Sequence, residues 1–358
     1  MAKTIIPFGP QHPVLPEPVH LKLVVEDEIV KEAIPALGYV HRGLEKLVEI
    51  RDFHQMVQIV ERVCGICSCI HAKAYCQGIE ELMGVEIPDR ARFLRVIWGE
   101  LHRIHSHLLW LGLFADAFGF ESVFQQFWKV REKIMDILEA TAGNRVIISV
   151  NVVGGTRYDL TPEQLRWILE GLTEVEAGVK ALQRTMLDDY TVKKRTVGVG
   201  MLSREQAIEL GAAGPTLRGS GVSQDMRQLG YSAYCDLDFE PVVETGCDSY
   251  ARSTVRFRET LQSIDLIRQA ISRLPGGDIN VPVKGNPEGE IVTRVEQPRG
   301  ELMYYIKASG KKYLDRCRIR TPTFANVPPL LAMVGGIELA DVPVVVLSID
   351  PCISCTER

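Results

Sequence analysis

The sequence predicts a mainly α-helical fold with small β parts, an α+β class. Apolar residues recur at helical intervals over long stretches between residues 44 and 275. Beyond residue 275 the sequence changes to glycine, proline and β-branched runs, which favour short strands. The 358 residues contain no internal repeat and no Ser/Gly-rich linker. We therefore expect one domain over residues 1–358, with β-containing ends packed on one helical body.

The first segment, residues 1–43, is expected to be loop and β structure. Its proline-rich start favours an irregular loop, because proline has no backbone donor. Apolar residues then alternate over residues 21–25, an acidic turn occupies residues 26–28, and a second apolar run begins at Ile29. This pattern predicts a short hairpin after the loop.

The second segment, residues 44–275, is expected to be a bundle of helices. Capping hydroxyls with a glutamine three positions later predict two helix starts, at Thr161 and Ser203. The apolar periodicity predicts the longer helices, which span residues 44–63, 89–118, 121–140 and 249–274.

The third segment, residues 276–358, is expected to be mixed α/β. Runs rich in β-branched and aromatic residues predict three strands, at residues 290–295, 301–308 and 343–349.

Two Cys-x-x-Cys pairs lie far apart in the chain: Cys64 with Cys67, and Cys352 with Cys355. Two intervening residues let both sulfurs of a pair turn toward one ion, and two pairs complete a four-thiolate shell. The fold must then bring the two segments together. Four thiolates favour a structural zinc or iron–sulfur site, and the spacing alone favours zinc. A catalytic soft-metal site is the alternative.

The composition excludes several classes of function. A net charge of -5 and a pI near 6.0 do not suggest a basic nucleic-acid surface, so nucleic acid is not an expected partner. The apolar runs at residues 108–115 and 342–349 are shorter than the roughly 20 residues of a spanning helix. Residues 1–4 lack the apolar core of a secretory signal, so we expect a cytoplasmic protein.

The residues around both cysteine pairs resemble the signature motifs of the large subunit of nickel-iron hydrogenases. The first motif reads Arg62-Val63-Cys64-Gly65-Ile66-Cys67 with His71 four positions on, and the second reads Asp350-Pro351-Cys352-Ile353-Ser354-Cys355. The resemblance implies a helical body with β-containing ends, and a single catalytic domain over residues 1–358. Because the second motif ends close to Arg358, we also expect a following segment that is removed after the metal is installed.

Other segments resemble the energy-converting, membrane-associated (Ech-like) branch of that family and the related quinone-site subunit of complex I. They are Gly9-Pro10-Gln11-His12-Pro13, His41-Arg42-Gly43-Leu44-Glu45, Gly143-Asn144-Arg145 and Pro298-Arg299-Gly300-Glu301. The complex I subunit is similar in fold but lacks the four metal-binding cysteines, so the hydrogenase interpretation is favoured. A complex I-like quinone-site or coupling subunit and a structural zinc protein remain the alternatives.

The resemblance implies a nickel-iron centre that interconverts dihydrogen with protons and electrons. Cys64 and Cys352 would be terminal nickel ligands, and Cys67 and Cys355 would bridge nickel and iron. The iron would carry carbon monoxide and cyanide. Soft thiolate donors suit such a centre, because they can hold nickel in an open geometry.

The resemblance also implies roles for residues around the metal. Glu17 would accept the proton near a terminal nickel thiolate. Arg299 would lie over the open metal position and pair with Asp350, with Pro298 beside the diatomic ligands. His71 would donate a hydrogen bond to a ligand sulfur.

Glu45 matches a family position that helps to bind magnesium or another divalent ion near the chain end. Many family members supply a histidine there, whereas this chain has Arg358. Because an arginine cannot bind a cation and can pair with Glu45 instead, we do not expect the magnesium site. Glu45 is kept as a possible divalent-ion or proton-path residue.

The expected partners follow from the resemblance. Electrons would pass to a small subunit carrying a 4Fe-4S cluster, and then through further iron–sulfur subunits to ferredoxin. Integral membrane subunits would couple the reaction to ion translocation. The chain itself would lie at the cytoplasmic face of the membrane as a peripheral subunit.

Overall fold

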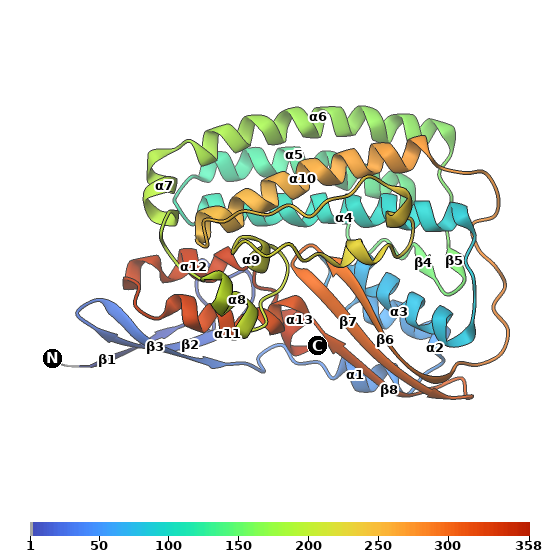
Figure 1. The fold of residues 1–358 in the computed structure, drawn as a ribbon, viewed down its shortest axis with the longest axis horizontal. Coiled ribbons are helices and arrows are strands. Elements are labelled where there is room, and N and C mark those ends of the chain that lie inside the picture. The colour runs from blue at the N-terminus through green and yellow to red at the C-terminus, as the bar shows by residue number, and fades with distance from the viewer. Residues whose placement is uncertain (1–2) are drawn as a thin grey trace.

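The computed structural model describes residues 3–358 and shows a mainly helical protein with three small antiparallel sheets (Figure 1). This confirms the predicted fold class. Among the described residues, we find no helix with the length and apolar character needed to cross a membrane.

Four long helices form the helical body, as expected: α4 (Asp89–Asp116), α5 (Glu121–Ala142), α6 (Pro162–Leu187) and α10 (Ser249–Ser272). Helix α4 packs against α5 and α10, and α6 covers both of those helices from the other side (Figure 1). The two predicted helix starts are present as complete capping boxes at Thr161 and Ser203. Most residues of α4 are buried, because this helix packs against other elements on most of its sides.

The N-terminal sheet has the order β1 (Thr4–Phe8), β2 (His20–Glu26) and β3 (Ile29–Ala36). The predicted hairpin is formed by β2 and β3. Strand β1 was not expected, because its Pro7 suggested loop. It pairs antiparallel with β2 at the edge of the sheet, the position where a strand tolerates proline.

The continuous helix expected over residues 44–63 is wrong. The chain forms α1 (Leu44–Val48) and α2 (Phe53–Glu61), because the Asp52 side chain accepts a hydrogen bond from the His54 backbone N–H and starts a new helix. Helix α3 (Ser68–Met83) begins directly after Cys67. The first cysteine pair therefore lies in a short loop at a helix junction.

The C-terminal sheet has the order β6 (Glu288–Gln297), β7 (Gly300–Ser309) and β8 (Leu314–Arg320). It contains two of the predicted strands and adds β8. Helix α3 packs on this sheet through β6 and β7. The chain then forms α11 (Pro322–Val334), α12 (Val342–Ser348) and α13 (Ile353–Glu357), and the last of these carries Cys355.

The strand expected at residues 343–349 is also wrong, because α12 occupies this segment. Nearly every residue of α12 is buried, so its apolar run shows no helical period. The hydrophobic pattern of such a short apolar run does not distinguish a buried strand from a buried helix. Pro343 at the start of the segment suits the first turn of a helix.

Short elements complete the chain. They are β4 (Asn151–Val152), β5 (Gly155–Thr156), α7 (Tyr190–Thr196), α8 (Arg204–Glu209), α9 (Pro215–Arg218), η1 (Met226–Leu229), η2 (Tyr234–Asp236) and η3 (Leu339–Asp341).

Candidate metal centre

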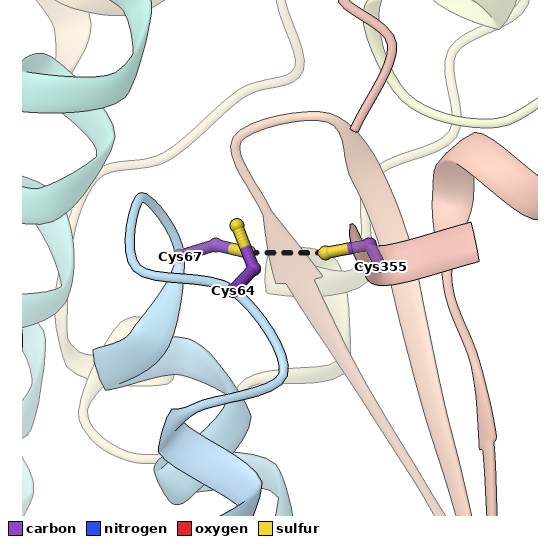
Figure 2. Close-up of side chains that lie close together, drawn as sticks. All are labelled: Cys64, Cys67 and Cys355. Atoms are coloured by element: carbon purple, nitrogen blue, oxygen red, sulfur yellow. Dashed lines mark hydrogen bonds between the residues drawn. The ribbon is translucent and has the colours of Figure 1, made fainter. Parts of the chain in front are cut away.

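The structure brings both cysteine pairs into one buried cluster. The Sγ atoms of Cys64 and Cys352 are 3.3 Å apart, and those of Cys67 and Cys355 are 3.6 Å apart. Figure 2 shows Cys64 and Cys67 in the loop before α3, facing Cys355 of α13. All four residues belong to the main hydrophobic core. Core packing thus joins two segments that are far apart in sequence.

The charge on this cluster is set by burial and by contacts between the thiols. The hydrogen bond from Cys352 lowers the pKa of Cys64 well below the usual value of a thiol. Burial raises the pKa of Cys67 and of Cys355 well above it. These shifts favour a thiolate at Cys64, and a cation that binds all four sulfurs must displace the remaining protons.

His71 connects the cluster to the C-terminal sheet. Its Nε2 lies 3.6 Å from the Cys355 Sγ, and its Nδ1 lies 2.7 Å from the hydroxyl of Tyr304 on β7. Burial lowers the pKa of His71 to about 4 and raises that of Tyr304, so both are neutral near pH 7. The Tyr304 hydroxyl can then donate to Nδ1, which leaves the Nε2 proton facing the sulfur.

Tyr304 was missed by sequence reasoning. It occupies one of the alternating buried positions of β7. Such a position predicts a core residue, and nothing in the local sequence shows which partner a buried hydroxyl meets.

Arg299 and Asp350 form a buried ion pair beside the cluster. The Arg299 Nη2 lies 2.9 Å from the Asp350 Oδ1, and the Arg299 Nε donates to the Asp350 backbone oxygen at 2.9 Å. Within residues 3–358, the Arg299 Nη1 and the Asp350 Oδ2 have no hydrogen-bond partner. Pro298 is buried in the turn between β6 and β7. The pair is thus fixed in place while each partner keeps one polar atom free.

A cavity of about 310 Å³ opens next to the cysteines Cys64 and Cys352. Glu17, Arg299 and Asp350 contribute its polar wall. The remaining walls are formed mainly by apolar side chains and backbone, from Pro16, Gly65, Ile66, Leu109, Trp110, Leu113, Leu347 and Pro351. A small apolar molecule can therefore reach one side of the sulfur cluster.

Glu17 is anchored to the segment that carries the second cysteine pair. Its carboxylate accepts hydrogen bonds from the backbone N–H groups of Ile353 and Ser354, the latter at 2.9 Å, and from the Ser354 hydroxyl. These donors fix the carboxylate at the start of α13, between the solvent-facing N-terminal loop and the cavity.

The donor set fits a soft metal. Four thiols can supply thiolates, and these select zinc, nickel or iron over magnesium or calcium. A structural zinc site is normally closed on all sides. Here a cavity with a free guanidinium nitrogen adjoins two of the four sulfurs, which suits a catalytic centre with an open position.

The chain matches two protein-family models and is similar to several known proteins over its whole length. The family model described as "Nickel-dependent hydrogenase" matches residues 42–114, and the model described as "Respiratory-chain NADH dehydrogenase, 49 Kd subunit" matches residues 117–286 and 283–358. The chain is 40% identical over 375 residues to the alpha subunit of the membrane-bound hydrogenase of Pyrococcus furiosus, covering 99% of this chain and 87% of that protein. It is 38% identical over 364 residues to the carbon monoxide-induced hydrogenase of Rhodospirillum rubrum, with 100% of both covered.

The chain belongs to the energy-converting hydrogenase large-subunit family, which is related to complex I. Its relatives also include one component of the NADH-quinone oxidoreductase of Geotalea uraniireducens, which is 35% identical over 375 residues with 96% of each chain covered. The family thus contains hydrogenases and quinone oxidoreductases.

Glu45, the possible divalent-ion or proton-path residue, is paired with two arginines. Its Oε1 lies 3.2 Å from the Arg358 Nε and accepts the Ile319 backbone N–H at 2.9 Å, while its Oε2 meets Arg318 at 3.2 Å. Two guanidinium groups already neutralise this carboxylate. A divalent cation that bound Glu45 would have to displace these two arginines.

Histidines on α4 do not extend the cysteine cluster of this hydrogenase-family chain. The rings of His102 and His105 stack at 5.5 Å, and the Nε2 of His107 lies 3.0 Å from the Glu259 carboxylate. Burial lowers the pKa of His102 to about 4. Within residues 3–358, Cys64, Cys67 and Cys355 form the one group of three or more potential ligands whose atoms all lie within 4.8 Å of one another.

Proposed function

We propose that this chain is the catalytic large subunit of a nickel-iron hydrogenase that interconverts dihydrogen with two protons and two electrons. The observation that carries the proposal is the convergence of four buried thiols beside a cavity with mostly apolar walls. When bound there, a nickel-iron centre with carbon monoxide and cyanide on iron supplies the site at which dihydrogen is split and its electrons are taken up.

Four residues would hold the two metals. Cys64 and Cys352 would bind nickel alone, and Cys67 and Cys355 would bridge nickel and iron. The sulfur geometry supports this division, because the Sγ atoms of Cys64 and Cys352 are 3.3 Å apart and those of Cys67 and Cys355 are 3.6 Å apart. The two cysteines assigned to nickel alone are also the two that line the cavity.

Glu17 would accept and release the proton. Its carboxylate shares the cavity with Cys64 and Cys352, so a proton on either sulfur has a nearby acceptor. The backbone donors of Ile353 and Ser354 keep the carboxylate oriented without blocking every lone pair. On its other side Glu17 lines an open pocket formed by the N-terminal loop, which gives the proton an exit.

The basic and neutral groups around the cavity would orient the reactants. Arg299, fixed by Asp350, presents a positive charge that can polarise a small ligand and donate to an anionic one. His71, held neutral by burial, donates to the Cys355 sulfur and so tunes its basicity.

The electrons would leave through a partner. The described residues offer no second ligand group for an iron–sulfur cluster, so we propose a small subunit with a 4Fe-4S cluster and exchange with ferredoxin. A relative named as a subunit of a membrane-bound hydrogenase supports assembly with further iron–sulfur and integral membrane subunits at the cytoplasmic face of the membrane. Coupling to ion translocation belongs to this proposal.

Exchange of deuterium between dihydrogen and heavy water tests the proposal, because it needs the metal site and the proton acceptor but no electron partner. The purified complex should catalyse exchange, and Cys355→Ser should abolish it, since a hard hydroxyl replaces a bridging thiolate. Cys69→Ser is the matched control, because Cys69 is buried nearby and bonds to Asn151 instead of the cluster. Absence of exchange in the wild-type complex with its metal present would refute the proposal.

A quinone-site subunit of a complex I-like enzyme is the second candidate. The similarity to the NADH-quinone oxidoreductase component favours it, and the apolar walls of the cavity could accept a ring. This candidate predicts electron transfer to a soluble quinone that survives Cys355→Ser. The hydrogenase proposal predicts that all activity is lost in that variant.

A further inference from the structure

Arg42 connects the two segments that carry the cysteines. Its Nη1 donates to the Arg62 backbone oxygen at 2.8 Å, and its Nη2 donates to the Val63 backbone oxygen at 2.7 Å. The same Nη2 also reaches the Ser354 backbone oxygen at 3.2 Å. Arg62 and Val63 immediately precede Cys64, and Ser354 lies next to Cys355. One guanidinium therefore bonds to the backbone beside a ligand from each pair.

The contacts with Arg62 and Val63 occur at a helix end whose carbonyls need a donor. The carbonyls of Arg62 and Val63 follow the last turn of α2, where oxygens have no partner within the helix and the helix dipole is negative. The Ser354 carbonyl lies in α13, where it accepts the Arg358 backbone N–H at 3.1 Å, and Arg42 donates to the same oxygen as a second partner. A planar guanidinium can donate to several oxygens in fixed directions, whereas a lysine ammonium cannot reproduce this fork.

The segment around Arg42 also holds the end of the chain. The Glu357 carboxylate accepts the backbone N–H groups of Gly38 and Val40, each at 2.5 Å, and the His41 Nδ1 contacts the Glu357 backbone oxygen. We name residues 38–45 the clasp, because they bind the C-terminal segment through backbone, carboxylate and guanidinium contacts. Within the clasp, Arg42 is the residue whose side chain contacts both cysteine-bearing segments.

We propose that Arg42 is a positioning residue that keeps the two cysteine pairs at metal-binding distance, and that the clasp retains the metal by holding the C-terminal segment closed. Cys352 precedes α13 and Cys355 lies on it, and a helix of five residues depends on contacts with other segments for its stability. The Arg42 side chain is exposed at its tip, so each bond contributes modestly, but all of them must break before the two pairs can separate. This inference rests on the proposed function only in that a metal occupies the cysteines.

Metal release from the purified complex tests this role. The complex is mixed with an excess of a chromogenic chelator that binds nickel, iron and zinc, and the release rate is followed. Arg42→Ala should release metal about tenfold faster, which corresponds to about 1.4 kcal/mol and to the loss of a few charged hydrogen bonds at a partly exposed site. Arg42→Lys should give an intermediate rate, and methylguanidinium added at a non-denaturing concentration should slow release from Arg42→Ala.

Arg62→Ala is the matched control, since the Arg62 side chain bonds only to the Gln58 carbonyl of its own helix among the described residues. It should release metal at the wild-type rate. A second readout is the rate at which iodoacetamide alkylates Cys355 in the presence of the chelator, which should rise in Arg42→Ala and stay unchanged in Arg62→Ala. A thermal midpoint equal to that of the control variant would show that general stability does not explain the difference.

Wild-type release and alkylation rates in both Arg42 variants would overturn the inference. If Arg42→Ala does not assemble, the lysine variant decides the question by the same rates. The identity of the released metal is measured separately. Zinc in place of nickel would contradict the proposed function but would not affect the inference about Arg42.

Discussion

Replacement of Glu17 by glutamine should separate proton transfer from metal binding. The carboxylate accepts hydrogen bonds from the Ile353 N–H, the Ser354 N–H and the Ser354 hydroxyl, and it lines the cavity beside Cys64. Glutamine has the same shape, and its oxygen can keep both backbone bonds while its amide group donates to the Ser354 hydroxyl. The variant therefore keeps the anchor on α13 and loses only the capacity to take up a proton.

The contacts of Glu17 set the expected size of two effects of Glu17→Gln, the loss of stability and the loss of exchange rate. Charged hydrogen bonds contribute roughly 1.5–3 kcal/mol and neutral ones about 1 kcal/mol, so the change should cost about 1–3 kcal/mol of local stability. A positioned acid or base typically accounts for a rate factor of about 10²–10⁴. Deuterium exchange should fall by that factor, while the nickel content stays at the wild-type level.

The assay measures deuterium exchange and nickel content on the same preparation of the complex. Ser354→Ala is the comparison, because it removes one donor to Glu17 and keeps the carboxylate; its exchange rate should stay close to that of the wild type. Unchanged exchange in Glu17→Gln would refute the proton-transfer role. Loss of nickel in Glu17→Gln would show that the carboxylate serves mainly to dock α13.

Three further predictions follow from buried or paired charges. Arg299→Ala leaves the buried Asp350 without its partner and should destabilise the chain by about 3–5 kcal/mol in urea unfolding. Burial lowers the pKa of His102 from its usual 6.5, which applies in the unfolded chain, to about 4 in the folded one. The folded state should therefore lose up to roughly 3 kcal/mol from this group as the pH falls from 6.5 to 4, and His102→Leu should reduce that loss. Because Arg358 pairs with Glu45, removing magnesium with a chelator should leave the thermal midpoint unchanged, and a drop would contradict the assignment.

The fold class and the joining of the two cysteine pairs could be predicted from the sequence, because long helical periodicity and Cys-x-x-Cys spacing are local signals. The errors arose where local signals are ambiguous. The run at residues 343–349 is buried on all sides in α12, so its hydrophobicity carries no period. The break between α1 and α2 depends on one capping contact of Asp52, which apolar periodicity does not reveal.

The contacts that support the cluster could not be predicted in the same way. Tyr304 reaches His71 across a large sequence separation, and Arg42 reaches both cysteine-bearing segments. Each contact depends on how α3, the C-terminal sheet and the chain end pack together. A sequence motif can identify a residue of such an arrangement. The hydrogen bond that this residue makes is determined by tertiary packing.

Metal analysis combined with infrared spectroscopy of the purified complex tests the central claim most directly. The account predicts nickel and iron bound to this chain, with the stretching bands of carbon monoxide and cyanide on a low-spin iron, and loss of both metals in Cys64→Ser. Zinc alone, or no metal and no such bands, would contradict it and would favour a structural site or a quinone-site subunit.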